Sequence, residues 1–160
     1  MVWSIQLITG VKYFMKRTRE QVIWDFVQGW LQKAEGDLLA ANRLIEVEQE
    51  DYFTTTFHAQ QVAEKFLKAF LVCHQIPFPK THDIQQLLEL SAQAAPSLKS
   101  ELALASMLSP FGVEFRYPGE EPADFETAQL SLQEAKRVKA VVLKHLRDYL
   151  GQGRPSDTNL

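Results

Sequence analysis

The chain has 160 residues, 46% of them hydrophobic and 10 of them phenylalanine, which is enough for one domain with a single core. A net charge of −3 excludes a whole-protein field that would attract nucleic acid or an anionic membrane, so any phosphate binding must be local. The single cysteine, Cys73, excludes an internal disulfide and a cysteine-rich zinc site. These features predict a cytoplasmic protein in a reducing compartment.

Residues 1–17 are predicted to be an N-terminal extension outside the folded domain. The mildly apolar stretch 1–13 precedes the basic residues, which reverses the order found in a signal peptide. It is also too short to span a bilayer, which takes about 20 apolar residues. Two interpretations are open for residues 1–14: a loose extension, or a segment that precedes a start of translation at Met15. No segment of the chain is predicted to form a strand.

Two long helices are expected first. Thr18 and Gln21 form a capping-box pattern at the start of a helix that runs to about Val47. Its apolar face is predicted to comprise Ile23, Phe26, Trp30, Ala34, Leu38, Ala41 and Ile45. A second helix covers about residues 54–74 and ends before Pro77, because proline cannot continue the hydrogen-bond ladder.

Three further helices complete the predicted fold. Thr81 is expected to cap the third, which places His82 at its first helical position. The fourth opens at residues 96–97 and buries one face, comprising Leu98, Leu102, Ala105 and Leu108. The last begins at an Asp124 N-cap and ends at Gly151. The fold class is therefore all-α, an up-and-down bundle of about five helices, two of them long, over residues 18–150, followed by a disordered tail at 151–160.

A polar stripe on the second helix raises the question of function. In "HAQQVAEKFLKAFL" (58–71), Gln60, Gln61, Glu64 and Lys68 share the face opposite the apolar residues. Glu64 and Lys68 are spaced as a favourable i,i+4 ion pair. By periodicity alone the stripe is a solvated face. Its alternative is a polar subunit contact or a ligand groove.

Two short motifs are candidate phosphate ligands. Lys80 and His82 lie where a helix N-terminus favours anions, although His82 could equally pack or cap a turn. Arg116 and Tyr117 precede Pro118, which restricts Tyr117 to extended geometry and lets both side chains project from a loop. Arginine can grip phosphate and tyrosine can stack on a base, while the alternative is a structural role for both.

Other chemistries are not predicted. The sequence contains no Gly-rich phosphate loop, no HExxH and no metal-ligand spacing, so neither a metal nor a cofactor is expected. Cys73 and His74 are adjacent, but neighbouring helical positions point about 100° apart, which favours a buried inert thiol. The basic residues of the last helix, among them Arg137 and Lys144, are interpreted as a charged outer face.

Taken together, four segments resemble the HEPN family, the higher eukaryotes and prokaryotes nucleotide-binding domain. They are "KAEGDLLAANRL" (33–44), "HAQQVAEKFLKAFL" (58–71), "PKTHDIQQLL" (79–88) and "RYP" (116–118) before a long last helix. The resemblance covers about residues 28–147. It implies a compact helical bundle, a homodimer, nucleotide or RNA binding, and partnership with a small nucleotidyltransferase in a toxin–antitoxin-like pair. It also favours an inter-helix or inter-subunit groove for the polar stripe.

The resemblance stops short of the ribonucleases of the wider superfamily, which carry an R-x4-6-H motif. Arg116 has no histidine four to six residues beyond it, and seven residues separate Arg137 from His145. The related R-x4-H-Y and R-x5-Y forms are absent as well. We therefore expect a non-catalytic module that binds phosphate through Lys80, His82, Arg116 and Tyr117, with Lys68 and Gln61 along the groove. One alternative is a metal-independent endoribonuclease toxin that uses His82 or His145 with Arg116 or Arg137. The other is a purely structural interaction domain.

Overall fold

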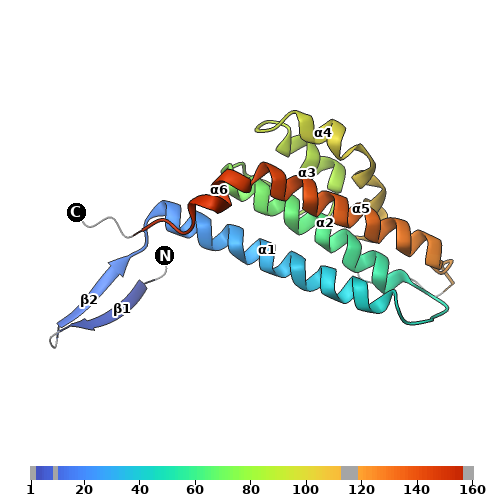
Figure 1. Ribbon diagram of the computed structural model, residues 1–160, viewed down its shortest axis with the longest axis horizontal. Helices are drawn as coiled ribbons and strands as arrows, with labels where there is room; N and C mark the ends of the chain where they lie inside the picture. Colours follow the sequence, from blue (N-terminus) through green and yellow to red (C-terminus); the bar gives the residue numbers. More distant parts are fainter. Residues whose placement is uncertain (1–2, 9–10, 113–118, 157–160) are drawn as a thin grey trace.

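The computed structural model describes residues 3–8, 11–112 and 119–156, with side chains from residue 17 onward. In chain order its elements are β1 (Trp3–Ile8), β2 (Val11–Lys16), α1 (Arg19–Leu44), α2 (Phe53–Cys73), α3 (Ile84–Ser91), α4 (Ser97–Glu101), the 3₁₀ helix η1 (Ala103–Phe111), α5 (Phe125–His145) and α6 (Arg147–Gln152). Figure 1 shows α1, α2 and α5 side by side along the long axis, with α3 and α4 covering one side of α2. The predicted all-α helical bundle is confirmed.

Helix α2 is the centre of the core, since it packs against α1, α3, α5 and η1. Phe66 and Phe70 are buried on it at 0% and 1% exposure, and burying such a side chain stabilises the fold by roughly 1.5–3 kcal/mol. The predicted inward face of the fourth helix is confirmed, since its buried members are Leu98, Leu102, Ala105 and Leu108. On α3 and α5 the fully buried side chains include Ile84, Leu87, Val138 and Val142.

The apolar face of α1 is only partly as predicted. The Thr18 capping box is present, with both the Thr18 and the Gln21 side chains in hydrogen bonds to backbone N–H groups. Ala34, Leu38 and Ala41 are buried as expected. Phe26 was predicted to face the core and does not, because its side chain is 61% exposed and Val27 points inward in its place. In its first turns, α1 therefore presents an aromatic residue outside the core.

The start of α3 also differs from the prediction. Asp83, not Thr81, is the N-cap, and its carboxylate accepts hydrogen bonds from the N–H groups of Gln85 and Gln86. The N–H of Ile84 donates to the Ser109 hydroxyl at 3.0 Å. His82 therefore precedes the helix, and a carboxylate already occupies the helix N-terminus where an anion was expected.

The C-terminal helices end differently from the prediction as well. The fourth predicted helix is divided at Leu102 into α4 and η1, and α5 is followed after Leu146 by the short α6. The chain leaves α6 at Gly153, not Gly151, and Gly153 adopts a φ of 74°, a conformation that glycine tolerates best.

Two segments outside the bundle carry structure of their own. Strands β1 and β2 pair antiparallel from Trp3 opposite Lys16 to Ile8 opposite Val11, beyond the start of α1 (Figure 1). The prediction that no segment forms a strand was therefore wrong, and the alternation of apolar and polar residues in "WSIQL" was the signal for it. At the other end of the chain, the Arg154 Nε lies 3.2 Å from an Asp25 oxygen, which brings the tail onto α1.

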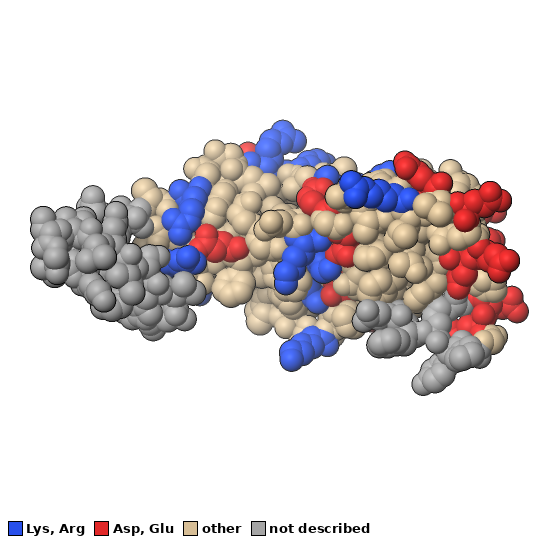
Figure 2. All heavy atoms as spheres, turned by 90° about the horizontal axis from the view of Figure 1, so that it is seen from below, with Lys and Arg blue, Asp and Glu red and all other residues tan. Residues whose placement is uncertain are grey.

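Acidic side chains gather at one end of the molecule, while Lys and Arg lie along the rest of the face seen in Figure 2. This end is where the loops after α1 and before α5 meet, with the Tyr52 N–H donating to the Ala123 carbonyl at 2.9 Å. The exposed acids of the two loops are Glu46, Glu48, Glu50, Asp51, Glu120, Glu121 and Asp124. Such an end repels phosphate. None of the described helices is long and apolar enough to cross a membrane.

Candidate functional site

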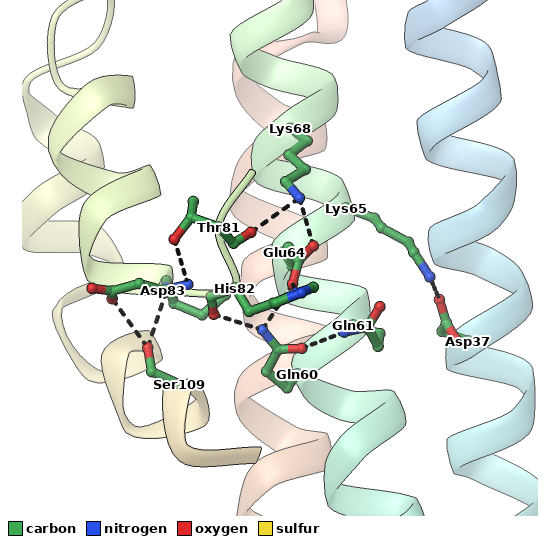
Figure 3. Close-up of polar contacts among 11 residues, drawn as sticks. Asp37, Gln60, Gln61, Glu64, Lys65, Lys68, Thr81, His82, Asp83 and Ser109 are labelled. Carbon is green, nitrogen blue, oxygen red and sulfur yellow. Dashed lines mark hydrogen bonds and ion pairs between the residues drawn. The ribbon is translucent and has the colours of Figure 1, made fainter. Parts of the chain in front are cut away.

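The carboxylate of Glu64 is the centre of a polar network on α2 (Figure 3). Lys68 Nζ lies 2.6 Å from Oε1, and on Oε2 the amide of Gln60 donates at 3.0 Å. The ring Nδ1 of His82 lies 2.9 Å from the same Oε2. The predicted i,i+4 pair is therefore formed, but it belongs to a larger network.

This network is buried. Gln60, Glu64 and Lys68 are 0%, 3% and 7% exposed, so the interpretation of the polar stripe as a solvated face is wrong. Segment 79–83, between α2 and α3, covers the stripe, so the polar residues line a contact within one chain (Figure 3). Buried ions are tolerated only when they are paired and hydrogen-bonded, and the network supplies both conditions.

Backbone carbonyl groups of the covering segment complete the network. Lys68 Nζ also donates to the Thr81 carbonyl at 3.2 Å, and Gln60 Nε2 donates to the His82 carbonyl at 2.9 Å. Gly112, at the end of η1, packs so closely that a Cβ there would lie 3.0 Å from both Gln60 Nε2 and the His82 Cβ. Side chains of α2 thus fix the backbone on either side of the His82 ring.

Glu64 is ionised in this environment. Burial raises the pKa of its carboxyl group, but the hydrogen bonds from Lys68, Gln60 and His82 outweigh burial and leave the pKa below its ordinary value. An ionised carboxylate only accepts hydrogen bonds, so the Nδ1 of His82 must be the donor. The remaining ring nitrogen, Nε2, is then the one that can meet a ligand.

His82 itself is accessible. Its side chain is 63% exposed, although the carboxylate that it contacts is only 4% exposed. Lys80, two residues earlier, is exposed and forms no ion pair with any described residue. The structure therefore combines a fixed imidazole with an exposed ammonium group on one short segment, an arrangement suited to holding a phosphate or to moving a proton.

A second polar group ties α2 to α1. Asp37 on α1 is ion-paired with Lys65 and also contacts His58 Nδ1 at 2.8 Å. The Asp37 carboxylate is 12% exposed. Lys65 and His58 are thus used for packing α2 against α1, and both side chains are directed to Asp37 and not to the His82 ring.

The other predicted ligands occupy different positions. Lys68 directs its ammonium group into the network and not to solvent, with 9% of its side chain exposed. Gln61 is partly exposed and donates to the Gln60 side-chain oxygen at 2.7 Å. Arg116 and Tyr117 lie outside the described residues. Lys68 and Gln61 therefore reach the His82 ring only through Glu64 and Gln60.

Arg137 and His145 meet at Glu101 despite the long spacing between them. Arg137 Nη2 donates to the Glu101 carbonyl at 2.9 Å, and His145 Nε2 lies 3.0 Å from the Glu101 carboxylate. Lys144 contacts the same carboxylate at 3.2 Å. Hydrogen bonds from His145, Ser97 and Lys144 lower the pKa of Glu101 to about 2. These charges fasten α4 to α5 and lie apart from His82.

The surroundings of Cys73 and His74 shift the pKa values of both side chains. Burial raises the pKa of the Cys73 thiol to about 11, so the thiol stays protonated at neutral pH as predicted. Burial, and after it the charge of His145, lower the pKa of His74. Among the described residues, no group of three or more His, Cys, Asp or Glu side chains is placed to hold a metal ion.

Glu64 and Gln60 organise the site, although the sequence does not single them out. In the sequence, Glu64 is recognisable only as an ion-pair partner of Lys68, and Gln60 only as part of a polar face. Their i,i+4 spacing with Lys68 placed all three on one line of the helix, and that was the available signal. Helical periodicity does not show that segment 79–83 covers these three residues.

The comparisons with known proteins support the resemblance seen in the sequence. The family model described as "HEPN domain" matches residues 27–146, well over half of the chain. Neither a curated protein nor a solved structure matches significantly. The matched range includes α2, the covering segment and all of α5. The chain therefore belongs to the HEPN domain family, and this membership supports a nucleotide- or RNA-related function in general.

Proposed function

We propose that this protein binds a phosphate group of a nucleotide or of RNA through Lys80 and His82. The observation that carries the proposal is the exposed imidazole of His82, held at Nδ1 by the buried carboxylate of Glu64 at 2.9 Å. Because Nδ1 donates to Glu64, Nε2 can donate to a phosphate oxygen once the ring is protonated. Lys80 adds a second positive charge on the same segment.

The other predicted residues take defined parts in this proposal. Lys68 positions the ring by holding Glu64, and Gln61 supports Gln60, so neither needs to touch the phosphate. We propose that Arg116 clamps the phosphate and that Tyr117 stacks on the base, as expected from the sequence. They follow Gly112, which touches Gln60 and His82, by four and five residues in the sequence.

Calorimetric titration with ATP, GTP and a short single-stranded RNA tests the proposal. Lys80→Glu and His82→Ala should each weaken binding by a factor on the order of ten or more, because each removes a hydrogen bond to a charged group. Lys99→Glu, the same charge change on exposed α4, should leave affinity unchanged. Equal affinities in all four proteins would contradict the assignment to this segment.

A partner and a dimer form the second part of the proposal. Membership of the family supports a homodimer that acts with a small nucleotidyltransferase in a toxin–antitoxin-like pair. We expect light scattering to give twice the chain mass of 18.3 kDa, and co-expression with a nucleotidyltransferase encoded by a neighbouring gene to yield a complex. A monomer that co-purifies with no such enzyme would contradict this part alone.

A metal-independent endoribonuclease is the second candidate function, because a histidine held by a buried carboxylate also suits a general base. The two candidates differ in their dependence on pH. Phosphate binding needs the protonated ring and strengthens as the pH falls, whereas a general base needs the neutral ring and loses activity in acid. RNA cleavage that declines in acid and disappears in His82→Ala would favour the nuclease.

A further inference from the structure

An open aromatic groove lies along α1 and takes no part in the His82 network. It has a volume of about 510 Å³, within the usual range for sites that hold small molecules. Its lining includes Phe26, Gly29, Trp30, Lys33, Val72 and Phe78. The ring of Phe26, which the sequence placed in the core, is 61% exposed here. A hydrophobic side chain exposed alone on a protein surface needs no explanation, whereas an exposed apolar patch in a concave site indicates that something binds there.

The groove and the His82 site share a wall. Lys68 Nζ lies 5.4 Å from the Trp30 ring centre and 5.7 Å from that of Phe78, and the same ammonium group donates to the Thr81 carbonyl. Phe78 precedes Lys80 by two residues, a stretch of chain that spans at most about 7 Å. A ligand of nucleotide size could therefore reach both places at once.

The charges around the groove favour a planar ligand that carries negative charge. Lys33 Nζ lies 5.9 Å from the Trp30 ring centre and, among the described residues, forms no ion pair. Asp25, the acid in the lining, is neutralised by Arg17 at 2.7 Å and by Arg154 at 3.2 Å. Aromatic faces beside a free ammonium group suit a base and its phosphate better than they suit an aliphatic side chain of a partner protein.

We propose that this groove binds the base of the nucleotide, or of the RNA residue, whose phosphate is held by Lys80 and His82. The inference rests on the proposed function and adds a recognition site to it. The base stacks against Phe26 or Trp30, with the ammonium group of Lys33 beside the Trp30 ring. Stacking of this kind tolerates any base, because every base presents a π face.

Filling the groove tests the inference, and the chain offers a matched control. A Cβ built on Gly29 meets no atom within 4 Å, and the same holds for Gly36 on the same helix, which is not part of the groove lining. Leucine favours a helix more than glycine does, so Gly29→Leu and Gly36→Leu should both fold. Thermal unfolding verifies this, and Phe26→Ala provides a second variant that removes an exposed ring without filling space.

Titration with ATP and with inorganic tripolyphosphate separates the base from the phosphate. We expect Gly29→Leu and Phe26→Ala to weaken ATP binding by a factor on the order of ten and to leave tripolyphosphate binding unchanged, while Gly36→Leu changes neither. Unchanged ATP affinity in Gly29→Leu, alongside weaker ATP affinity in His82→Ala, would overturn the assignment of the base to the groove. The proposed phosphate binding by Lys80 and His82 would still stand. A native protein that binds neither probe would overturn both. A dimer that dissociates in Gly29→Leu while ATP affinity is kept would assign the groove to a second copy of the chain.

Discussion

Replacing Lys68 with methionine is expected to lower the free energy of unfolding by about 3–5 kcal/mol, the usual cost of leaving a buried charge without its partner. Lys68 is 7% exposed and its ammonium group is 2.6 Å from Glu64, so little water could replace it. Methionine keeps the apolar stem that packs near Trp30. Denaturant unfolding at neutral pH measures the loss.

The cause of this loss can be identified from how the stability of the Lys68→Met variant depends on pH. Without Lys68, burial raises the pKa of Glu64, so the deficit should shrink as the pH falls and the carboxyl group takes up a proton. Lys65→Met is the control, because its partner Asp37 keeps a contact with His58 and lies nearer to solvent. That change should cost about 1 kcal/mol or less. A similar small loss in Lys68→Met would show that the network is not sealed from water.

Replacing both members of the pair should separate stability from binding. The free energy of unfolding of the double variant Glu64→Leu/Lys68→Met is expected to lie within about 1–2 kcal/mol of that of the native protein. Exchanging a whole buried ion pair for apolar groups is often neutral for stability. Its affinity for ATP should nevertheless fall by a factor on the order of ten, because no carboxylate then orients the His82 ring. Calorimetry and denaturation on the same sample measure both effects.

The outcome separates two accounts of the network. Retained stability with retained affinity would mean that His82 binds without help from Glu64. Lost stability beyond that of Lys68→Met would mean that the surrounding donors, Gln60 among them, require the carboxylate. The first result would contradict the positioning role that we assign to Glu64. The second would show that the carboxylate also stabilises the fold by satisfying these donors.

Periodicity predicted the core well because a helix buries one continuous face. Ala34, Leu38 and Ala41 followed that rule, since α2 covers α1 along this line. Phe26 did not, because its position faces the groove, where no helix of the bundle covers it. The alternation of the first residues marked a strand pair, but their modest apolar content resembled that of an extension.

The polar site was harder to predict for a related reason. The spacing of Gln60, Glu64 and Lys68 shows that they share a face, but it does not show what covers that face. The cover is segment 79–83, whose path depends on where α3 begins. Thr81 and Asp83, two residues apart, are both residue types that can cap a helix, and the carboxylate of Asp83 does so in place of the Thr81 hydroxyl. His82 therefore lies outside the helix, where its ring can meet Glu64.

The measurement that tests the central claim most directly is the ¹⁵N NMR spectrum of the His82 ring during titration with ATP. We predict that Nδ1 keeps its proton throughout and donates it in a hydrogen bond to Glu64. Nε2 should gain a proton as the nucleotide binds and donate it in a hydrogen bond to a phosphate oxygen. The spectrum of the Glu64→Gln variant should respond less at the same ATP concentration. Binding of ATP by calorimetry with no change at either nitrogen of His82 would contradict the account.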